Sequence, residues 1–106
     1  MRLSIRYVPD FYYKRIQFYD DHSSYMKSVS DNFLKENKSL AGGTTFPSEN
    51  AIWYLNGIQE DEVDQILHND PFFKAGLVES WEIKEMQIFG RTSVEGLASM
   101  YEYTCI

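Results

Sequence analysis

Residues 69–77 of this 106-residue chain have the sequence NDPFFKAGL, and they separate a predicted helix from a predicted strand. The preceding residues 60–68 carry acidic side chains in the first turns and apolar ones at helical spacing, which is typical of an amphipathic helix. Pro71 ends that helix, because the residue before a proline avoids helical backbone angles. Residues 72–77 are then expected to form a compact turn or one helical coil, and residues 78–89 the longest strand.

The N-terminal third of the chain predicts one strand and one helix. Leu3, Ile5 and Tyr7 alternate with polar residues, which is the period-two pattern of a strand. Residues 11–19 contain several rings without a clean period, and we expect a loop that packs on the core. From His22 to about residue 36, apolar residues recur at helical spacing, so a helix is expected there with an aspartate just before it as the N-cap.

The middle of the chain predicts a hairpin, and the hairpin completes the order of elements. Residues 39–45 include two adjacent glycines and indicate a short strand, while residues 51–55 are apolar on both faces, as in a strand covered on both sides. The resulting order β-α-β-β-α-β predicts an α+β, ferredoxin-like split βαβ fold, with an antiparallel sheet and two helices on one face. Residues 1–90 are the predicted domain, and residues 91–106 a C-terminal helical extension.

The second face of the sheet is expected to be covered by another copy of the chain. If Trp53 or Tyr54, Trp81 and residues of the first strand point away from the helices, the apolar area is too large to leave in water. The plainest solution is a symmetric homodimer in which two sheets pack face to face.

Composition and charge restrict the partners and the compartment. Hydrophobic residues make up 43% of the chain and aromatic ones 16%, which excludes disorder. A formal net charge of −6 would on average repel a phosphate backbone or an anionic membrane, so neither nucleic acid nor a membrane is an expected partner. No apolar run approaches the ~20 residues of a membrane span. The single cysteine, Cys105, allows no intramolecular disulfide, and a reducing cytoplasm is the expected compartment.

His22 and Asp70 are the candidate acid–base pair, because one opens the first helix and the other follows the second. Both helices pack on one sheet face, so these two ends could meet at one rim. A carboxylate that accepts the Nδ1 hydrogen of an imidazole fixes its tautomer, and Nε2 can then move a proton on a substrate. Structural alternatives stay open at this point. His22 could cap its helix or pack beside Tyr25, and Asp70 could be the N-cap of the turn that follows it.

Four further residues are candidates for binding a small-molecule substrate. Arg6 could hold a carboxylate or an enolate, and an edge or interface salt bridge is its alternative role. Gly43 could present its N–H group to a ligand oxygen, or belong to a bulge. Phe72 and Trp81 belong to an aromatic set expected to form core and dimer interface, of which a subset could line a pocket for a planar ligand. We expect no cofactor and no metal, because neither a glycine-rich phosphate loop nor a metal-ligand spacing is present.

The string at residues 69–77, followed by Trp-Glu-Ile at 81–83, resembles the YciI-like (YCII-related) proteins, a branch of the dimeric α/β-barrel superfamily. His22 stands where these proteins have a histidine that opens the first helix, and the Ala-Gly-Gly of residues 41–43 resembles their small-residue segment. Residues 91–106 have no counterpart in the family. The family usually has proline after this glycine segment, where this chain has threonine.

The resemblance implies a homodimer with a His–Asp acid–base pair at His22 and Asp70. One branch of the family eliminates chloride from a chlorinated hydroxyquinol. The implied activity is therefore proton abstraction, elimination or isomerisation on a small aromatic or enolisable substrate, which is lyase or isomerase chemistry without a cofactor. The alternative is a non-catalytic homodimeric module of the same fold that binds a small ligand or serves in assembly. The marks of that alternative would be a separation of His22 and Asp70 too large for a hydrogen bond, and no pocket beside them.

Overall fold

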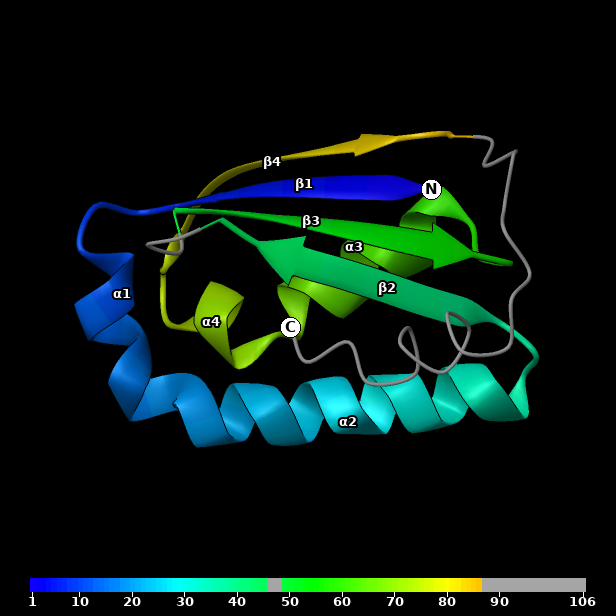
Figure 1. The fold of residues 1–106 in the computed structure, drawn as a ribbon, viewed down its shortest axis with the longest axis horizontal. Coiled ribbons are helices and arrows are strands. Elements are labelled where there is room, and N and C mark those ends of the chain that lie inside the picture. Colours follow the sequence, from blue (N-terminus) through cyan, green and yellow to red (C-terminus); the bar gives the residue numbers. More distant parts are fainter. Residues whose placement is uncertain (46–48, 87–106) are drawn as a thin grey trace.

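The computed structural model describes residues 1–45 and 49–86, and it has two layers, a sheet and a layer of helices (Figure 1). The elements in chain order are β1 (Arg2–Tyr7), α1 (Phe11–Lys14), the 3-10 helix η1 (Arg15–Phe18), α2 (Tyr19–Lys35), β2 (Ser39–Thr44), β3 (Asn50–Asn56), α3 (Glu60–His68), α4 (Pro71–Lys74) and β4 (Val78–Lys84). The strands form one antiparallel sheet in the order β2-β3-β1-β4. The predicted ferredoxin-like α+β fold is therefore confirmed.

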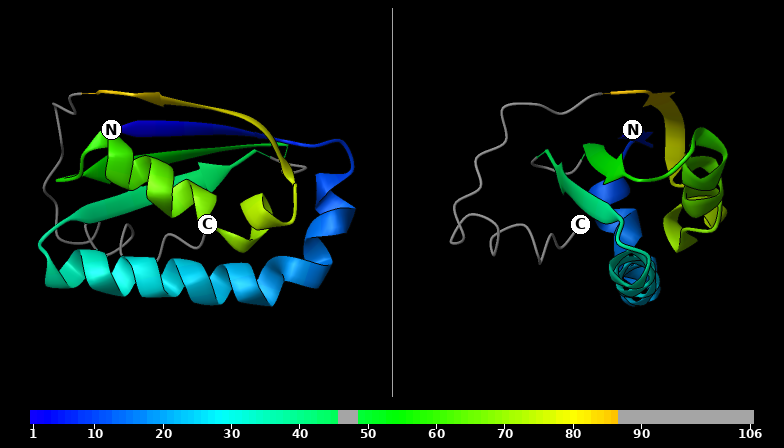
Figure 2. Two further views of the ribbon diagram at one scale, coloured as in Figure 1. Left: turned by 180° about the vertical axis from the view of Figure 1, so that it is seen from behind. Right: turned by 90° about the vertical axis from the view of Figure 1, so that its right-hand side faces the viewer.

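The core lies between the sheet and its two long helices. Alternate residues of β1 and β3 point toward the helices and are at most 5% exposed. They are Leu3, Ile5, Tyr7, Ala51, Trp53 and Leu55. Helices α2 and α3 contribute Met26, Val29, Phe33, Val63 and Leu67 to the same cluster. Figure 2 shows both helices on the same side of the sheet.

The opposite face of the sheet is covered by no helix of the described residues, and it is more polar than the sequence predicts. Trp53 pairs with Leu3 and Trp81 with Ile5 in the register, so both tryptophans lie on the helix side of the sheet. Of the aromatic residues considered for the bare face, Tyr54 lies there, and the placement of Trp53 and Trp81 on it is wrong. The outward positions of β1, β3 and β4 are Arg2, Ser4, Arg6, Asn50, Ile52, Tyr54, Asn56, Ser80, Glu82 and Lys84. Two of these ten side chains, Ile52 and Tyr54, are large and hydrophobic.

The segment between β1 and α2 is helical, which corrects the predicted loop over residues 11–19. Asp10 has a φ of 66° and turns the chain, and its carbonyl accepts the Lys14 N–H at 3.0 Å to start α1. No period is visible in the sequence because Phe11 is the only fully buried residue of this segment. Helix α2 consequently begins at Tyr19, and the predicted N-cap aspartates lie in its first turn, where negative charge complements the helix dipole.

The C-terminal strand is shorter in the described part of the chain than the predicted 78–89. Strand β4 ends at Lys84, and a register shift between Arg6 and Tyr7 leaves Glu79 as an extra residue opposite β1. Residues 85 and 86 are described and are not part of the strand, so the predicted strand is too long at least there. Residues 87–89, the boundary at residue 90, the helical extension 91–106 and the cysteine lie outside the described residues.

Two glycines with positive φ allow a matched test of backbone strain. Gly57 has φ +81° and a Cβ there would meet the Lys38 Cγ at 3.2 Å, whereas Gly76 has φ +76° and open space around it. We expect Gly76→Ala to lower the free energy of unfolding by about 1–2 kcal/mol through left-handed strain alone. Gly57→Ala should lower it further because Lys38 must also move. Urea unfolding of both variants checks this, and a smaller loss at Gly57 would contradict it.

Candidate active site

The site is built on a buried hydrogen bond between His22 and Asp70. The His22 Nδ1 and Asp70 Oδ1 atoms lie 2.7 Å apart, and each side chain is 2% exposed. His22 lies in the first turns of α2, and Asp70 directly precedes α4, so the two helix ends meet as the sequence predicts. The donor of this bond depends on the tautomer of His22; with the carboxylate as acceptor, we expect Nδ1 to carry the proton. The predicted contact is confirmed, and the catalytic role of the pair stays a prediction.

Asp70 is held in place by the start of α4. Its backbone is extended, with φ −65° and ψ 129°, and the same Oδ1 accepts the Phe72 N–H at 3.0 Å. Pro71 occupies the first helical position, where its missing N–H is not needed. Asp70 is therefore both the N-cap of α4 and the partner of His22. The predicted N-cap and the predicted contact with His22 are therefore both present.

Aromatic rings surround the pair on the side of β1. The His22 ring stacks on Phe72 with a centroid distance of 3.9 Å and an interplanar angle of 10°. Phe72 makes an edge contact with Phe11 at 5.2 Å, and Phe11 stacks on Tyr7 at 3.7 Å. This shell restricts the imidazole to one orientation and keeps water away from its bond to Asp70.

The negative charge of Asp70 affects the pKa values of two tyrosines. Burial raises the pKa of the Tyr7 phenol, and the negative charge of Asp70 raises that pKa further. Burial, with the same charge second, raises the pKa of Tyr25 to about 12. The Tyr25 hydroxyl donates to the Ile66 carbonyl at 2.7 Å, which ties α2 to α3. Both phenols therefore hold their protons more strongly than a phenol in water.

The two phenols give a test of the charge on Asp70. Asp70→Asn is expected to lower the pKa of both Tyr7 and Tyr25, measured by carbon NMR of the ring carbons that bear the hydroxyls. Glu62→Gln is the control, because among the described residues Asp70 is the acid whose charge raises the Tyr25 pKa. Unchanged phenol pKa values in Asp70→Asn would show that residue 70 carries no charge.

The same shifts determine how stability responds to alkali. A raised folded pKa contributes stability that is present below the ordinary phenol pKa of about 10 and is lost as the pH rises through the folded value. For Tyr25 this window runs from about pH 10 to about pH 12. The free energy of unfolding should therefore fall with pH above about 10, and Tyr7→Phe should make this fall shallower. Urea unfolding at a series of alkaline pH values measures it, and equal slopes in the two proteins would contradict it.

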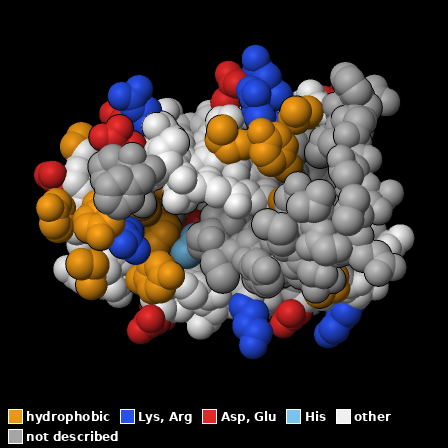
Figure 3. Space-filling model, viewed as in Figure 1, with side chains coloured by type: hydrophobic (Ala, Val, Ile, Leu, Met, Phe, Trp, Pro, Cys, Tyr) orange, Lys and Arg blue, Asp and Glu red, His pale blue; other side chains and the backbone are white. Residues whose placement is uncertain are grey.

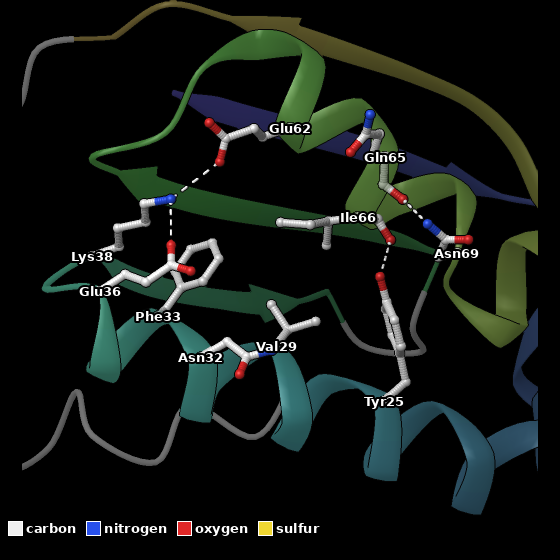
Figure 4. Close-up of a pocket in the computed structure, with 10 residues that line it drawn as sticks. All are labelled: Tyr25, Val29, Asn32, Phe33, Glu36, Lys38, Glu62, Gln65, Ile66 and Asn69. Carbon is white, nitrogen blue, oxygen red and sulfur yellow. Dashed lines mark hydrogen bonds and ion pairs between the residues drawn. The ribbon is translucent and has the colours of Figure 1, made fainter.

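Two cavities flank the buried pair without including it among their described lining residues. One of about 250 Å³ lies between α2 and α3; Tyr25, Val29, Phe33 and Ile66 line it, and Lys38 pairs with two glutamates at its rim (Figure 4). The other, of about 700 Å³, lies where β1 leads into α1. Arg6, Tyr7, Asp10, Phe11 and Tyr12 are among its lining residues. Each cavity thus has one of the two perturbed tyrosines in its wall.

The four predicted substrate-binding residues do not all lie next to His22 and Asp70. Phe72 contacts His22 directly. Arg6 lines the larger cavity from the polar sheet face and pairs with Glu79 at 3.4 Å. Gly43 lies in β2, on that same outer face, and Trp81 contacts Phe73 on α4 at 5.2 Å. Arg6, Gly43 and Trp81 do not contact the pair, and their roles in binding stay predictions.

Tyr7, Phe11 and Tyr25 lie at the site, and the sequence does not identify them as candidate functional residues. The alternation of β1 and the helical spacing of α2 identify Tyr7 and Tyr25 as inward-facing residues and nothing more. Phe11 follows Pro9-Asp10 in a segment with no periodic signal. No pattern in the sequence distinguishes these rings from the other core aromatics.

The described residues contain neither a metal-binding cluster nor a membrane-spanning helix. In residues 1–45 and 49–86, no group of three or more His, Cys, Asp or Glu side chains could hold a metal ion. Within the same residues, every helix is too short or too polar to cross a membrane.

The fold and the buried pair together define an α+β, ferredoxin-like protein with a His–Asp pair at one rim of its sheet. Among solved structures, the chain is similar to 5-chloro-2-hydroxyhydroquinone dehydrochlorinase from Burkholderia phenoliruptrix, in a complex with 2,5-dihydroxybenzoquinone. The TM-score is 0.63 at 22% sequence identity, over 81% of this chain and 91% of that one. This likeness shows the ferredoxin-like fold. No protein-family description and no curated protein sequence matches the chain.

Proposed function

We propose that this protein is an acid–base enzyme that acts on a small hydroxylated aromatic or enolisable substrate without a cofactor. His22 is the acid–base group and Asp70 is the residue that orients it. The single observation that carries the proposal is the Nδ1–Oδ1 bond of 2.7 Å between two side chains that are each 2% exposed. Burial of a histidine with a carboxylate costs free energy of desolvation, and such buried ionisable pairs are frequent at functional sites.

The bond to Asp70 determines which nitrogen does the chemistry. With the proton on Nδ1, the lone pair of the neutral imidazole is on Nε2, and this atom takes a proton from a substrate O–H or C–H bond. Asp70 stabilises the imidazolium that results. The electron pair left on the substrate either forms an enolate or expels a leaving group as an anion. In an isomerisation, Nε2 returns the proton to another substrate atom.

The fold neighbour supports an aromatic substrate. That enzyme is described as a dehydrochlorinase of a chlorinated hydroxyhydroquinone, and its structure holds a dihydroxybenzoquinone. Loss of chloride from such a ring needs a base to remove one proton, which is the task assigned here to His22. The ring-lined wall that Tyr7 and Phe11 give to the larger cavity suits a planar ligand of this kind.

Deuterium exchange tests the proposal without knowledge of the natural substrate. The protein is incubated in heavy water with 2,5-dihydroxybenzoquinone and a set of enolisable ketones, and deuterium at carbon is followed by NMR. In parallel, 5-chloro-2-hydroxyhydroquinone is tested for chloride release. Exchange or chloride release that depends on His22 supports the proposal. Equal rates in the wild-type protein and in His22→Gln would contradict it.

A non-catalytic binding module is the second candidate. The observation that favours it is that neither cavity has His22 or Asp70 among its described lining residues. In that case ligands bind in the larger cavity and are recovered unchanged, and His22 affects stability alone. Binding of a quinone without His22-dependent exchange of any probe would favour this candidate.

We also propose that the protein is a cytoplasmic homodimer with the polar sheet faces packed together. Ile52, which is 39% exposed, and Tyr54 supply the apolar centre of that interface, and the charged residues around them supply pairs. Ile52→Asp is expected to shift the dimer toward the 12.5 kDa single chain in analytical ultracentrifugation, and exposed Leu34→Asp on α2 is the control. A wild-type protein that sediments as a single chain at high concentration would contradict the dimer.

A further inference from the structure

Arg15, the first residue of η1, carries a positive charge that no carboxylate of the described residues pairs with. Arg2 pairs with Glu82 at 3.3 Å and Arg6 with Glu79 at 3.4 Å, whereas Arg15 forms no ion pair within residues 1–45 and 49–86. Its Nε atom is buried and has no hydrogen-bond acceptor there. A buried donor without an acceptor is unfavourable and calls for an explanation.

Two tyrosine rings hold the Arg15 guanidinium in place. Its Cζ atom lies 4.6 Å from the centre of the Tyr12 ring and 5.4 Å from that of Tyr19. These rings are 39% and 45% exposed, and the neighbouring Ile16 is 66% exposed. Hydrophobic side chains gather over the end of the molecule formed by α1 (Figure 3). The result is an oriented cation set in an apolar surface, which is the arrangement that binds an anion attached to a ring.

This arrangement adjoins the buried pair. Tyr12 also lines the 700 Å³ cavity, together with Tyr7 and Phe11 of the aromatic shell. Tyr19 lies three residues before His22 in α2, which places both on one face of the helix. Helix η1 packs against α4, which begins directly after Asp70. Arg15 is therefore connected to the larger cavity through Tyr12, and to the helix that carries His22 through Tyr19.

We propose that Arg15, held between Tyr12 and Tyr19, binds the anionic oxygen of a small aromatic ligand, so that this site takes carboxylates and phenolates in preference to neutral rings. The ligand oxygens pair with the two Nη atoms, which are not among the buried unpaired nitrogens of the described residues, in a bidentate geometry of guanidinium and carboxylate. Its ring lies on the tyrosines. The inference rests on the proposed function only in identifying this ligand with the substrate, because binding is measurable without turnover.

Calorimetry with a charged probe and its neutral counterpart tests the proposal. The probes are 2,5-dihydroxybenzoate and 2,5-dihydroxybenzamide, titrated into the full chain at about 0.15 M salt, where long-range fields are screened. The wild-type protein is expected to prefer the acid. Arg15→Gln should weaken binding of the acid by about 10–100-fold and leave the amide unchanged, since hydrogen bonds between charged groups contribute at this level. Arg15→Lys should bind the acid more tightly than Arg15→Gln because it keeps the positive charge. It should bind more weakly than the wild type because it lacks the planar guanidinium that makes two parallel hydrogen bonds.

Lys14→Gln is the matched control. It removes the same charge one residue earlier, from an exposed side chain without ring contacts, and it should bind both probes as the wild type does. His22→Gln separates this inference from the proposed function, because it removes turnover and should keep the preference for the acid. Thermal unfolding of each variant confirms that it is folded.

Several outcomes would overturn the proposal. They are equal affinity of the wild-type protein for acid and amide, no binding of the acid, an unchanged affinity in Arg15→Gln, or an equal loss in Lys14→Gln. The last would indicate a general charge effect. Binding of an acidic peptide through Arg15, without binding of the dihydroxybenzoate, would assign the residue to a protein partner instead.

Discussion

His22→Gln is expected to lower kcat/KM by about 10²–10⁴-fold, the usual contribution of a positioned acid–base group. Glutamine is a suitable replacement because its amide can still donate a hydrogen bond to Asp70 while it cannot take a proton near neutral pH. The buried carboxylate therefore keeps a partner, and the loss of rate is separated from a loss of folding. The measurement is the rate of chloride release or deuterium exchange on the probe that the wild-type protein turns over.

His68→Gln is the matched control for this variant. His68 ends α3 with a side chain 42% exposed, and its Nδ1 lies 2.7 Å from the Asp64 carbonyl. It is the other histidine of the chain, and its replacement should leave the rate at the wild-type value. A rate that falls in His68→Gln and not in His22→Gln would transfer the chemistry to His68 and contradict the account of the site.

Asp70→Ala is expected to lower the free energy of unfolding by about 2–5 kcal/mol. Its Oδ1 accepts from both the His22 imidazole and the Phe72 N–H, and both donors are buried. Each loses its acceptor in the alanine variant at about 1–3 kcal/mol, and the N-cap of α4 is lost with them. For a domain of this size, the corresponding fall in Tm is about 10–20 °C, which calorimetry measures.

Asp70→Asn distinguishes the structural role of Asp70 from its orienting role. The amide oxygen keeps an acceptor for the cap, so stability should fall less than in Asp70→Ala. The catalytic rate of Asp70→Asn should also fall, because the amide lacks the negative charge that stabilises the imidazolium. Exposed Asp31→Ala on α2 is the control and should change the free energy of unfolding by no more than about 0.5 kcal/mol. An Asp70→Ala variant as stable as this control would contradict the structural role.

The elements that were predicted well are those in which several local signals agree. Helix α3 begins and ends as predicted at Glu60 and His68, because an acidic first turn, apolar spacing and Pro71 all indicate the same bounds. Residues 11–19 carry no such agreement. Phe11 is the only buried residue among them, and one buried residue cannot produce a periodic pattern in the sequence.

The contact of His22 with Asp70 was predictable because the split βαβ order brings those two helix ends to one rim. The direction of Arg6 was also predictable, since Tyr7 points inward and neighbours in a strand point to opposite faces. The place of Tyr7 and Tyr25 at the site was not predictable, because it depends on their distance from the Asp70 charge, and only the packing of the chain determines that distance. Arg15 could not be identified as a candidate binding residue from the sequence, because its contacts with Tyr12 and Tyr19 depend on a helical turn that was predicted as a loop.

The tautomer of His22 tests the central claim most directly. Long-range proton–nitrogen NMR of histidine-labelled protein, with His68→Gln for assignment, reports which ring nitrogen carries the proton when the imidazole is neutral. The account predicts a protonated Nδ1 that donates to Asp70, with the lone pair on Nε2. A neutral His22 that carries its proton on Nε2 would make Asp70 the donor of the 2.7 Å bond, and the account of the pair as an oriented base would then be wrong.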